Sequence, residues 1–168
     1  MKQDVDYVMK YQEKKMNEDL RYIKMAYKEA IKAKELGEVP VGCVIVLNGK
    51  VIAKAHNLRE TKKSTLAHAE VLAIAKACKK TQTKFLDGAK IYITLEPCLM
   101  CLGAIIQARI DHICFSTEEP KFGAIVSCCH VLDDYKFNTT VSYSSGLLKE
   151  EVQNLMKEFF KDLRNKKQ

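Results

Sequence analysis

Apolar residues recur along the chain with two different periods, and these periods predict helices and strands in alternation. The first helical face has apolar residues three or four positions apart, at Leu20, Ile23, Tyr27, Ala30 and Ile31. Asn17 stands where a helix cap is expected, so we expect this helix to begin there and to end near Gly37. A second apolar stripe of this kind predicts the last helix and consists of Val152, Leu155, Met156, Phe159, Phe160 and Leu163.

Shorter apolar segments between these helices predict strands. Residues 41–47 form a continuous apolar run, as expected of a strand that is buried on both faces. Asn48-Gly49 favours a two-residue turn because both positions accept positive φ, so residues 50–56 should return as a second strand. Further strands are expected over 90–94, 111–115 and 140–143, and further helices over 67–78 and 98–108.

Strands that alternate with helices after an opening hairpin indicate a mixed sheet covered by helices on both faces. The length of 168 residues fits one domain, and a hydrophobic content of 47% excludes a disordered chain. No internal repeat or Pro/Gly/Ser-rich linker divides the sequence. We therefore predict an α/β fold with a single domain over residues 17–168, preceded by a charged extension over residues 1–16.

The distribution of charge and of cysteine bears on compartment and partner. No window approaches the ~18 consecutive apolar residues of a membrane span, and the first residues are charged where a secretory signal needs an apolar stretch. We therefore expect a cytoplasmic protein without a membrane partner. In that compartment the seven cysteines are thiols or metal ligands more often than disulfides.

The net charge of +7 comes from residues 50–90, where ten basic side chains face three acidic ones; the rest of the chain is balanced. A local basic field attracts polyanions because it neutralises phosphates and releases their counterions. An ordinary Lys-rich surface explains the same charge, so charge alone leaves nucleic-acid binding open.

Two short motifs carry the chemistry of the sequence: His68-Ala69-Glu70 and Pro97-Cys98-Leu99-Met100-Cys101. The first cysteine of the second motif stands thirty positions after the histidine of the first. One imidazole and two thiolates give three protein ligands, and catalytic zinc sites leave the fourth position to water. Each motif opens a predicted helix, whose dipole favours thiolates. A carboxylate such as that of Glu70 can accept a proton from a water whose pKa zinc has lowered.

Taken together, the two motifs resemble the signature of the zinc-dependent nucleobase deaminases, H-x-E with P-C-x-x-C. The resemblance implies the cytidine deaminase-like fold, a three-layer α-β-α sandwich with a central mixed five-stranded sheet. It implies one Zn²⁺ per subunit, held by His68, Cys98 and Cys101. It further implies that an activated water replaces an exocyclic amine while Glu70 carries the proton to the leaving nitrogen.

The resemblance extends beyond the two motifs to bacterial tRNA adenosine deaminases. The stretches that carry it are Glu38–Gly42, Thr94–Cys101 (which includes the second motif), Ala108–Ile110, Pro120–Ala124 and Leu155–Phe160. Members of that family convert the wobble adenosine (position 34) of a tRNA anticodon to inosine and act as homodimers. The resemblance implies that the substrate is bound by Asn57, Val41, Ala69, Glu119, Lys121 and Phe160.

Several alternatives stay open at this level. A deaminase of a free base or nucleoside, cytidine or guanine, would use the same zinc site. A structural zinc module that binds RNA without catalysis would instead need a fourth protein ligand. Either Phe159 or Phe160 can serve the core, and Arg109 fits a helix-end charge as well as a phosphate contact. The neighbouring Cys128 and Cys129 suit a second metal or redox site, or ordinary packing.

Overall fold

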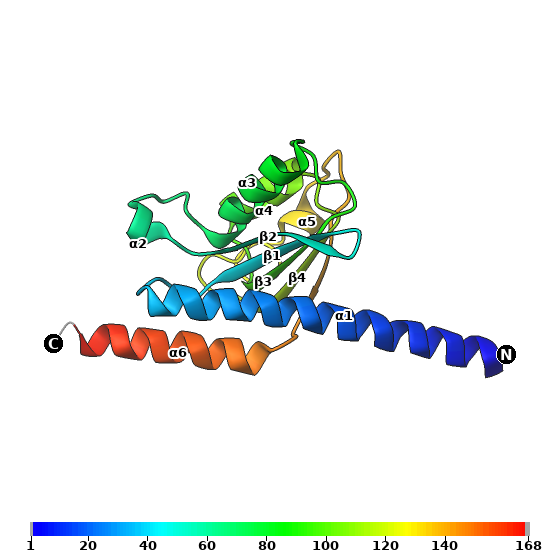
Figure 1. The fold of residues 1–168 in the computed structure, drawn as a ribbon, viewed down its shortest axis with the longest axis horizontal. Coiled ribbons are helices and arrows are strands. Elements are labelled where there is room, and N and C mark those ends of the chain that lie inside the picture. The colour runs from blue at the N-terminus through cyan, green and yellow to red at the C-terminus, as the bar shows by residue number, and fades with distance from the viewer. Residues whose placement is uncertain (1, 167–168) are drawn as a thin grey trace.

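The computed structural model describes residues 2–166 (the backbone alone for 2–5), and a mixed sheet lies at its centre (Figure 1). Its strands within the described residues are β1 (Gly42–Leu47), β2 (Lys50–His56), β3 (Lys90–Leu95), β4 (His112–Thr117) and β5 (Ser142–Ser145), in the order β2-β1-β3-β4-β5. Strand β1 is antiparallel to β2 and β3, whereas β3, β4 and β5 are parallel to one another. The predicted five-stranded mixed sheet is confirmed.

Helices cover both faces of this sheet (Figure 1). Helices α1 (Lys2–Glu35) and α6 (Lys149–Asn165) lie on one face, and α3 (Ala69–Thr81) and α4 (Leu99–Gln107) lie on the other. Two single-turn helices, α2 (Arg59–Lys62) and α5 (Val131–Asp134), belong to connecting segments. The arrangement is the predicted three-layer α-β-α sandwich.

Side chains of β1 alternate between the two cores, as the period of a strand requires. Cys43 and Ile45 are fully buried in the core beneath α3 and α4, whereas Val44 and Val46 pack in the core that contains Ile23 of α1. This burial on both faces explains why the sequence there is apolar without interruption. Asn48 and Gly49 both have positive φ and form the predicted turn into β2.

The expected helix start at Asn17 is wrong, because α1 runs unbroken through that residue from Lys2. The preceding residues are rich in Lys, Glu, Gln and Met, which favour helix, and no Pro or Gly interrupts them. Residues 6–18 are exposed, and α1 projects beyond the sheet over this length (Figure 1). Contact with the body begins at Asp19, whose carboxylate accepts a 2.6 Å hydrogen bond from the Tyr92 hydroxyl.

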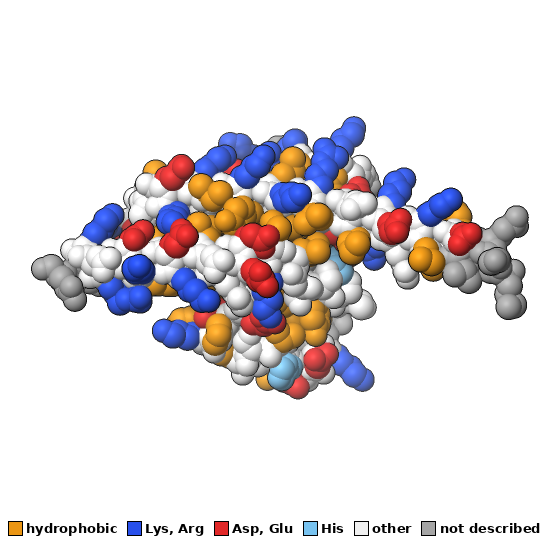
Figure 2. Space-filling view, turned by 90° about the horizontal axis from the view of Figure 1, so that it is seen from below, with side chains coloured by type: hydrophobic (Ala, Val, Ile, Leu, Met, Phe, Trp, Pro, Cys, Tyr) orange, Lys and Arg blue, Asp and Glu red, His pale blue; other side chains and the backbone are white. Residues whose placement is uncertain are grey.

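The face formed by α1 and α6 shows hydrophobic side chains gathered near its middle, with charged side chains along the outer sides of the helices (Figure 2). Val152, Leu155 and Phe159 are the buried residues of α6. None of the helices in the described part of the chain combines the length and hydropathy that crossing a bilayer requires.

Candidate metal centre and active site

The two predicted motifs meet because α3 and α4 begin side by side. His68 is the N-cap of α3 and Cys98 is the N-cap of α4, and both residues have extended backbone. Cys101 follows on the first turn of α4 and is fully buried. Because His68 precedes the helix and Glu70 lies in its first turn, the two side chains line the same cavity.

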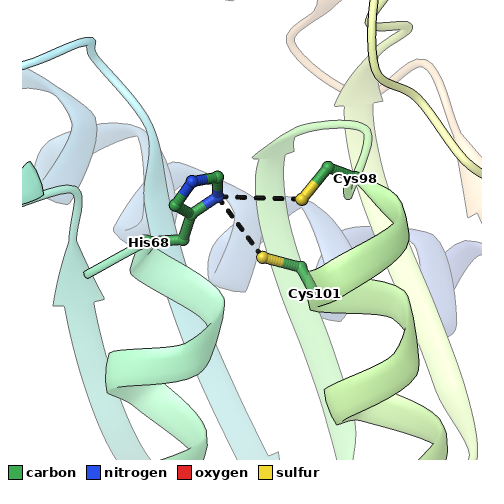
Figure 3. A group of neighbouring side chains, drawn as sticks. All are labelled: His68, Cys98 and Cys101. Carbon is green, nitrogen blue, oxygen red and sulfur yellow. Dashed lines mark hydrogen bonds between the residues drawn. The ribbon is translucent and has the colours of Figure 1, made fainter. Parts of the chain in front are cut away.

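The three predicted ligands converge on a common point (Figure 3). The Nδ1 atom of His68 lies 3.8 Å from Sγ of Cys98 and 3.5 Å from Sγ of Cys101. A tetrahedral zinc ion with ordinary bond lengths would place nitrogen and sulfur about 3.6 Å apart, so the donor set fits that ion. Among the described residues no fourth His, Cys, Asp or Glu joins this group, which disfavours a closed structural site.

The surroundings of the two cysteine thiols favour the thiolate form of Cys98. Cys101 and His68 form hydrogen bonds with Cys98, and these outweigh its burial and lower the pKa of Cys98 to about 4. The same hydrogen bond to Cys98, together with burial, raises the pKa of Cys101. Because a metal binds the thiolate form of cysteine, metal binding at this pair would displace any proton that either thiol carries.

Glu70 is a buried carboxylate, with 4% of its surface exposed, beside the ligands. Burial is the main cause that raises the pKa of Glu70, and the negative charge of the Cys98 thiolate raises it further. A hydrogen bond from its own backbone N–H and the positive charge of His68 lower the pKa but do not cancel the rise. A carboxyl group with a raised pKa can take up and return a proton near neutral pH, which is what general acid–base catalysis requires.

A cavity of about 540 Å³ opens in front of the ligands and Glu70. All six residues expected to bind substrate line it, and they come from five separate segments: Val41, Asn57, Ala69, Glu119, Lys121 and Phe160. Asn57 and Ala69 are buried and Val41 and Glu119 are half-buried, whereas Lys121 and Phe160 stand exposed at the mouth. The structure thus brings the whole predicted set to one place.

The sequence interpretation missed other lining residues, of which the largest side chains belong to Arg59, Met100, Phe122 and Met156. Met156 was assigned to the core stripe, although its separation of four positions from Phe160 puts both on one face of α6. No comparable signal marks Phe122, which is 69% exposed in an irregular loop.

Glu38 orients the loop on one side of the cavity. It is fully buried, and its carboxylate accepts hydrogen bonds from the backbone N–H groups of Glu60 at 3.1 Å and Thr61 at 2.6 Å. It also accepts a longer one, 3.4 Å, from the amide of Asn57. Burial acts to raise its pKa, but the hydrogen bonds, led by those from Thr61, lower it overall.

Glu96 has the matching position on the other side of the cavity, directly before Pro97 and Cys98. Its carboxylate accepts hydrogen bonds from backbone N–H groups of the loop that follows β4 and from the Ser127 hydroxyl. Burial acts to raise the pKa of Glu96, and these hydrogen bonds, led by that of Ser127, lower it overall.

Two alternatives left open by the sequence are resolved by position. Phe159 is a core residue and Phe160 a cavity residue. Arg109 lies away from the cavity, with its guanidinium 3.8 Å from the centre of the Phe85 ring, and belongs to a second hollow of about 700 Å³ around Phe85.

The vicinal cysteines lie outside the ligand group. Cys128 is exposed, with its thiol 3.0 Å from the carbonyl oxygen of Pro120, and Cys129 is half-buried against the core. In the region described, neither belongs to a cluster of metal-binding side chains.

A buried glutamate beside a His-Cys-Cys ligand set, at the start of paired helices in an α-β-α sandwich, defines the class of metal-dependent nucleobase deaminases. Comparisons with known proteins agree. The family model of the MafB19-like deaminases matches residues 17–164. The tRNA-specific adenosine deaminase of Bacillus subtilis (strain 168) is 47% identical over 152 residues, which is 90% of this chain and 94% of that protein. The chain therefore belongs to the MafB19-like deaminase family and groups with the tRNA-specific adenosine deaminases.

Solved structures support the same placement. One structure, from studies of A-to-I editing by tRNA:A34 deaminases at the wobble position of transfer RNA, is 36% identical and superposes with a TM-score of 0.77. The match covers 80% of this chain and 98% of that one. A guanine deaminase from Bacillus subtilis is 33% identical, with a TM-score of 0.58, over 86% of this chain and 92% of its own.

Proposed function

We propose that this protein is a tRNA-specific adenosine deaminase that hydrolyses the wobble adenosine of a tRNA anticodon to inosine and ammonia. The observation that carries the proposal is the cavity lined by His68, Cys98 and Glu70, with Cys101 beside it in the same ligand group, in a chain 47% identical to a relative named for that activity.

We propose Zn²⁺ as the cofactor, one per subunit, held by His68, Cys98 and Cys101. The chemistry of the donors supports this choice, because two thiolates and an imidazole suit zinc. When bound, zinc would act as a Lewis acid that makes water a nucleophile at neutral pH.

The residues of the chain supply the proton transfers and the binding of the base. Glu70 accepts the proton of the attacking water and returns it to the departing amine nitrogen. Asn57 points its amide N–H₂ at Glu38, which leaves its carbonyl oxygen to accept a hydrogen bond from the base. Ala69 and Val41 complete the enclosed part of the cavity, where the base excludes bulk water.

The mouth of the cavity suits an RNA loop. Phe122 and Phe160 are exposed aromatic side chains on which unstacked bases can lie, and Lys121 supplies a positive charge for the backbone. Proteins read unpaired loop bases more readily than bases within an RNA helix. We assign Glu119 to the same wall, and the basic segment 50–90 adds a wider attraction for a polyanion.

The remaining parts of the proposal follow from the tRNA substrate and from relatedness. We place the protein in the cytoplasm, where tRNA is available and cysteine ligands stay reduced. We infer a homodimer from the implied family resemblance, and light scattering or analytical ultracentrifugation of the metal-loaded protein tests it.

Sequencing of A-to-I changes in a tRNA pool incubated with the metal-loaded protein tests the function. We expect inosine at position 34 of at least one tRNA. We expect Glu70→Gln to reduce the editing rate by about 10²-fold or more while metal analysis still finds one zinc per chain. Editing at an undiminished rate by that variant would overturn the role of Glu70.

The similarity to a guanine deaminase supports one alternative, the deamination of a free base or nucleoside. Ammonia release from free guanine, cytidine and adenosine should be measured beside the tRNA assay. Efficient turnover of any of them, with no inosine in tRNA, would replace the proposed substrate while leaving the zinc chemistry intact.

A further inference from the structure

One wall of the cavity is an irregular loop that belongs to none of the helices or strands of the described residues. This segment, residues 118–127, is named the wall loop here; it follows β4 and contributes Glu119, Lys121 and Phe122 to the lining. An irregular loop of this length needs an anchor to keep three side chains in fixed positions.

The anchor is the carboxylate of Glu96, which is only 2% exposed. Its Oε1 atom accepts hydrogen bonds from the backbone N–H groups of Ile125 at 2.9 Å, Val126 at 2.7 Å and Ser127 at 3.1 Å. Its Oε2 atom accepts one from the N–H of Glu119 at 3.0 Å and another from the Ser127 hydroxyl. In the described part of the chain no cation lies within ion-pair distance of Glu96, so the wall loop itself satisfies the charge.

The backbone of the wall loop also approaches the metal-ligand segment closely. Gly123 forms an isolated β-bridge with Cys98, and the N–H of Ala124 donates a 3.0 Å hydrogen bond to the carbonyl of Pro97. A Cβ atom at Gly123 would overlap the Glu96 carboxylate and lie 2.7 Å from the carbonyl oxygen of Glu119. Glycine is therefore required there by the presence of the buried carboxylate.

These contacts join two parts of the site that are far apart in the sequence. Glu96 is two residues before the ligand Cys98, and its hydrogen bonds hold the loop that carries the exposed mouth of the cavity. The side chain itself faces the wall loop with both oxygens, so it has no free acceptor for a ligand or a proton transfer.

We propose that Glu96 is a positioning residue that holds the wall loop in register with the metal centre and thereby sets the affinity for the RNA substrate. The inference rests on the proposed function, because the wall loop faces the part of the substrate that surrounds the reacting base. Glu96 acts through the loop, not on the reacting atoms.

Glu96→Gln is the sharpest test, because it keeps the size of the side chain but replaces one acceptor oxygen by an N–H₂ group. That group must face either the N–H of Glu119 or the three N–H groups of residues 125–127, so at least one buried donor loses its acceptor. We expect KM for tRNA to rise about tenfold or more, with kcat within about threefold and the zinc content unchanged.

Glu35→Gln is the control, because it makes the same chemical change at an exposed position of α1, outside the wall loop and outside the lining of the cavity. We expect its KM and kcat to equal those of the unmodified protein. Gly123→Ala disrupts the same contact from the side of the loop and should raise KM for tRNA as Glu96→Gln does. Because both changes break one contact, KM of the double variant should be no higher than that of the single variant with the higher KM.

The outcomes separate the inference from its alternatives. An unchanged KM in folded Glu96→Gln, or a fall in kcat or zinc content without a rise in KM, would overturn it. If Glu96→Gln does not fold, Ser127→Ala removes a single donor, and an unchanged KM in that variant overturns the inference equally. Absence of editing by the unmodified protein would instead contradict the proposed function.

Discussion

At the scale of single residues, buried carboxylates organise this molecule, and the partners of each decide its role. Glu38 and Glu96 accept backbone N–H groups and fix loops, whereas Glu70 is held beside the metal ligands with a raised pKa. Glu29 differs from them because its partners are basic side chains: Nδ1 of His56 lies 2.8 Å and Nζ of Lys32 lies 2.6 Å from its oxygens.

The ion pairs of Glu29 predict a pH-dependent stability. Burial tends to raise its pKa, but hydrogen bonds from Lys32 and His56 and their charges lower it below the ordinary value of 4.5. Because the folded-state pKa is the lower one, the stabilisation is fully present above about pH 4.5 and is lost as pH falls through the folded-state value. Glu29→Gln should therefore cost about 1–3 kcal/mol of unfolding free energy at pH 7 and less at pH 4.

Urea unfolding at intervals between pH 7 and pH 4 measures this difference. Glu35→Gln, at an exposed position of the same helix, is the control and should follow the unmodified protein throughout. A Glu29→Gln deficit of the same size at every pH would contradict the assigned electrostatic cause.

At the scale of secondary-structure elements, α6 performs two tasks with neighbouring faces. Val152, Leu155 and Phe159 bury it against the body, while Met156 and Phe160 line the cavity. The two phenylalanines pack edge to face, with ring centres 5.3 Å apart, so the core residue also supports the cavity residue.

Alanine substitution of the two phenylalanines should separate stability from binding. Phe159→Ala should lower the unfolding free energy by about 3 kcal/mol because it removes a buried ring. Phe160→Ala should cost less than about 1 kcal/mol, since its side chain is 39% exposed, but should raise KM for tRNA several-fold. Denaturant unfolding and tRNA kinetics on both variants check this; a stability loss confined to Phe160→Ala would contradict the assignment.

Sequence periodicity predicted where the helices and strands lie better than it predicted what each of their faces contacts. The apolar stripe located α6, but it could not separate Phe159 from Phe160, because which face meets a cavity depends on segments distant in the sequence. The grouping of the three candidate ligands was predictable because His68, Cys98 and Cys101 stand in two compact motifs with a chemical requirement for their spacing. The role of Glu96 was not predictable from the sequence, since its hydrogen-bond partners lie in an irregular loop that has no periodicity.

At the scale of the whole molecule, we propose that residues 17–168 form the deaminase domain and that residues 1–16 are an appendage to it. The support is the exposure of residues 6–18 along the projecting part of α1, where the packing of the domain begins only at Asp19. Such an appendage contributes little to the free energy of folding.

Removal of residues 1–16 tests this division. A truncated protein that begins at Asn17 should keep its melting temperature within about 3 °C of the full chain, because no buried side chain of the described residues is lost. It should also edit tRNA at an unchanged rate. Thermal unfolding and the editing assay give both values, and a larger fall in melting temperature would assign the appendage to the folded core.

The late position of α6 along the chain has a consequence during synthesis on the ribosome. All three metal ligands have been translated by residue 101, but Met156 and Phe160 arrive more than fifty residues later. Because nascent chains fold from the N-terminal side first, an incomplete chain can gather its ligands while its substrate cleft still lacks one side. Until α6 has been synthesised, the growing polypeptide therefore lacks part of the surface that we propose for tRNA binding.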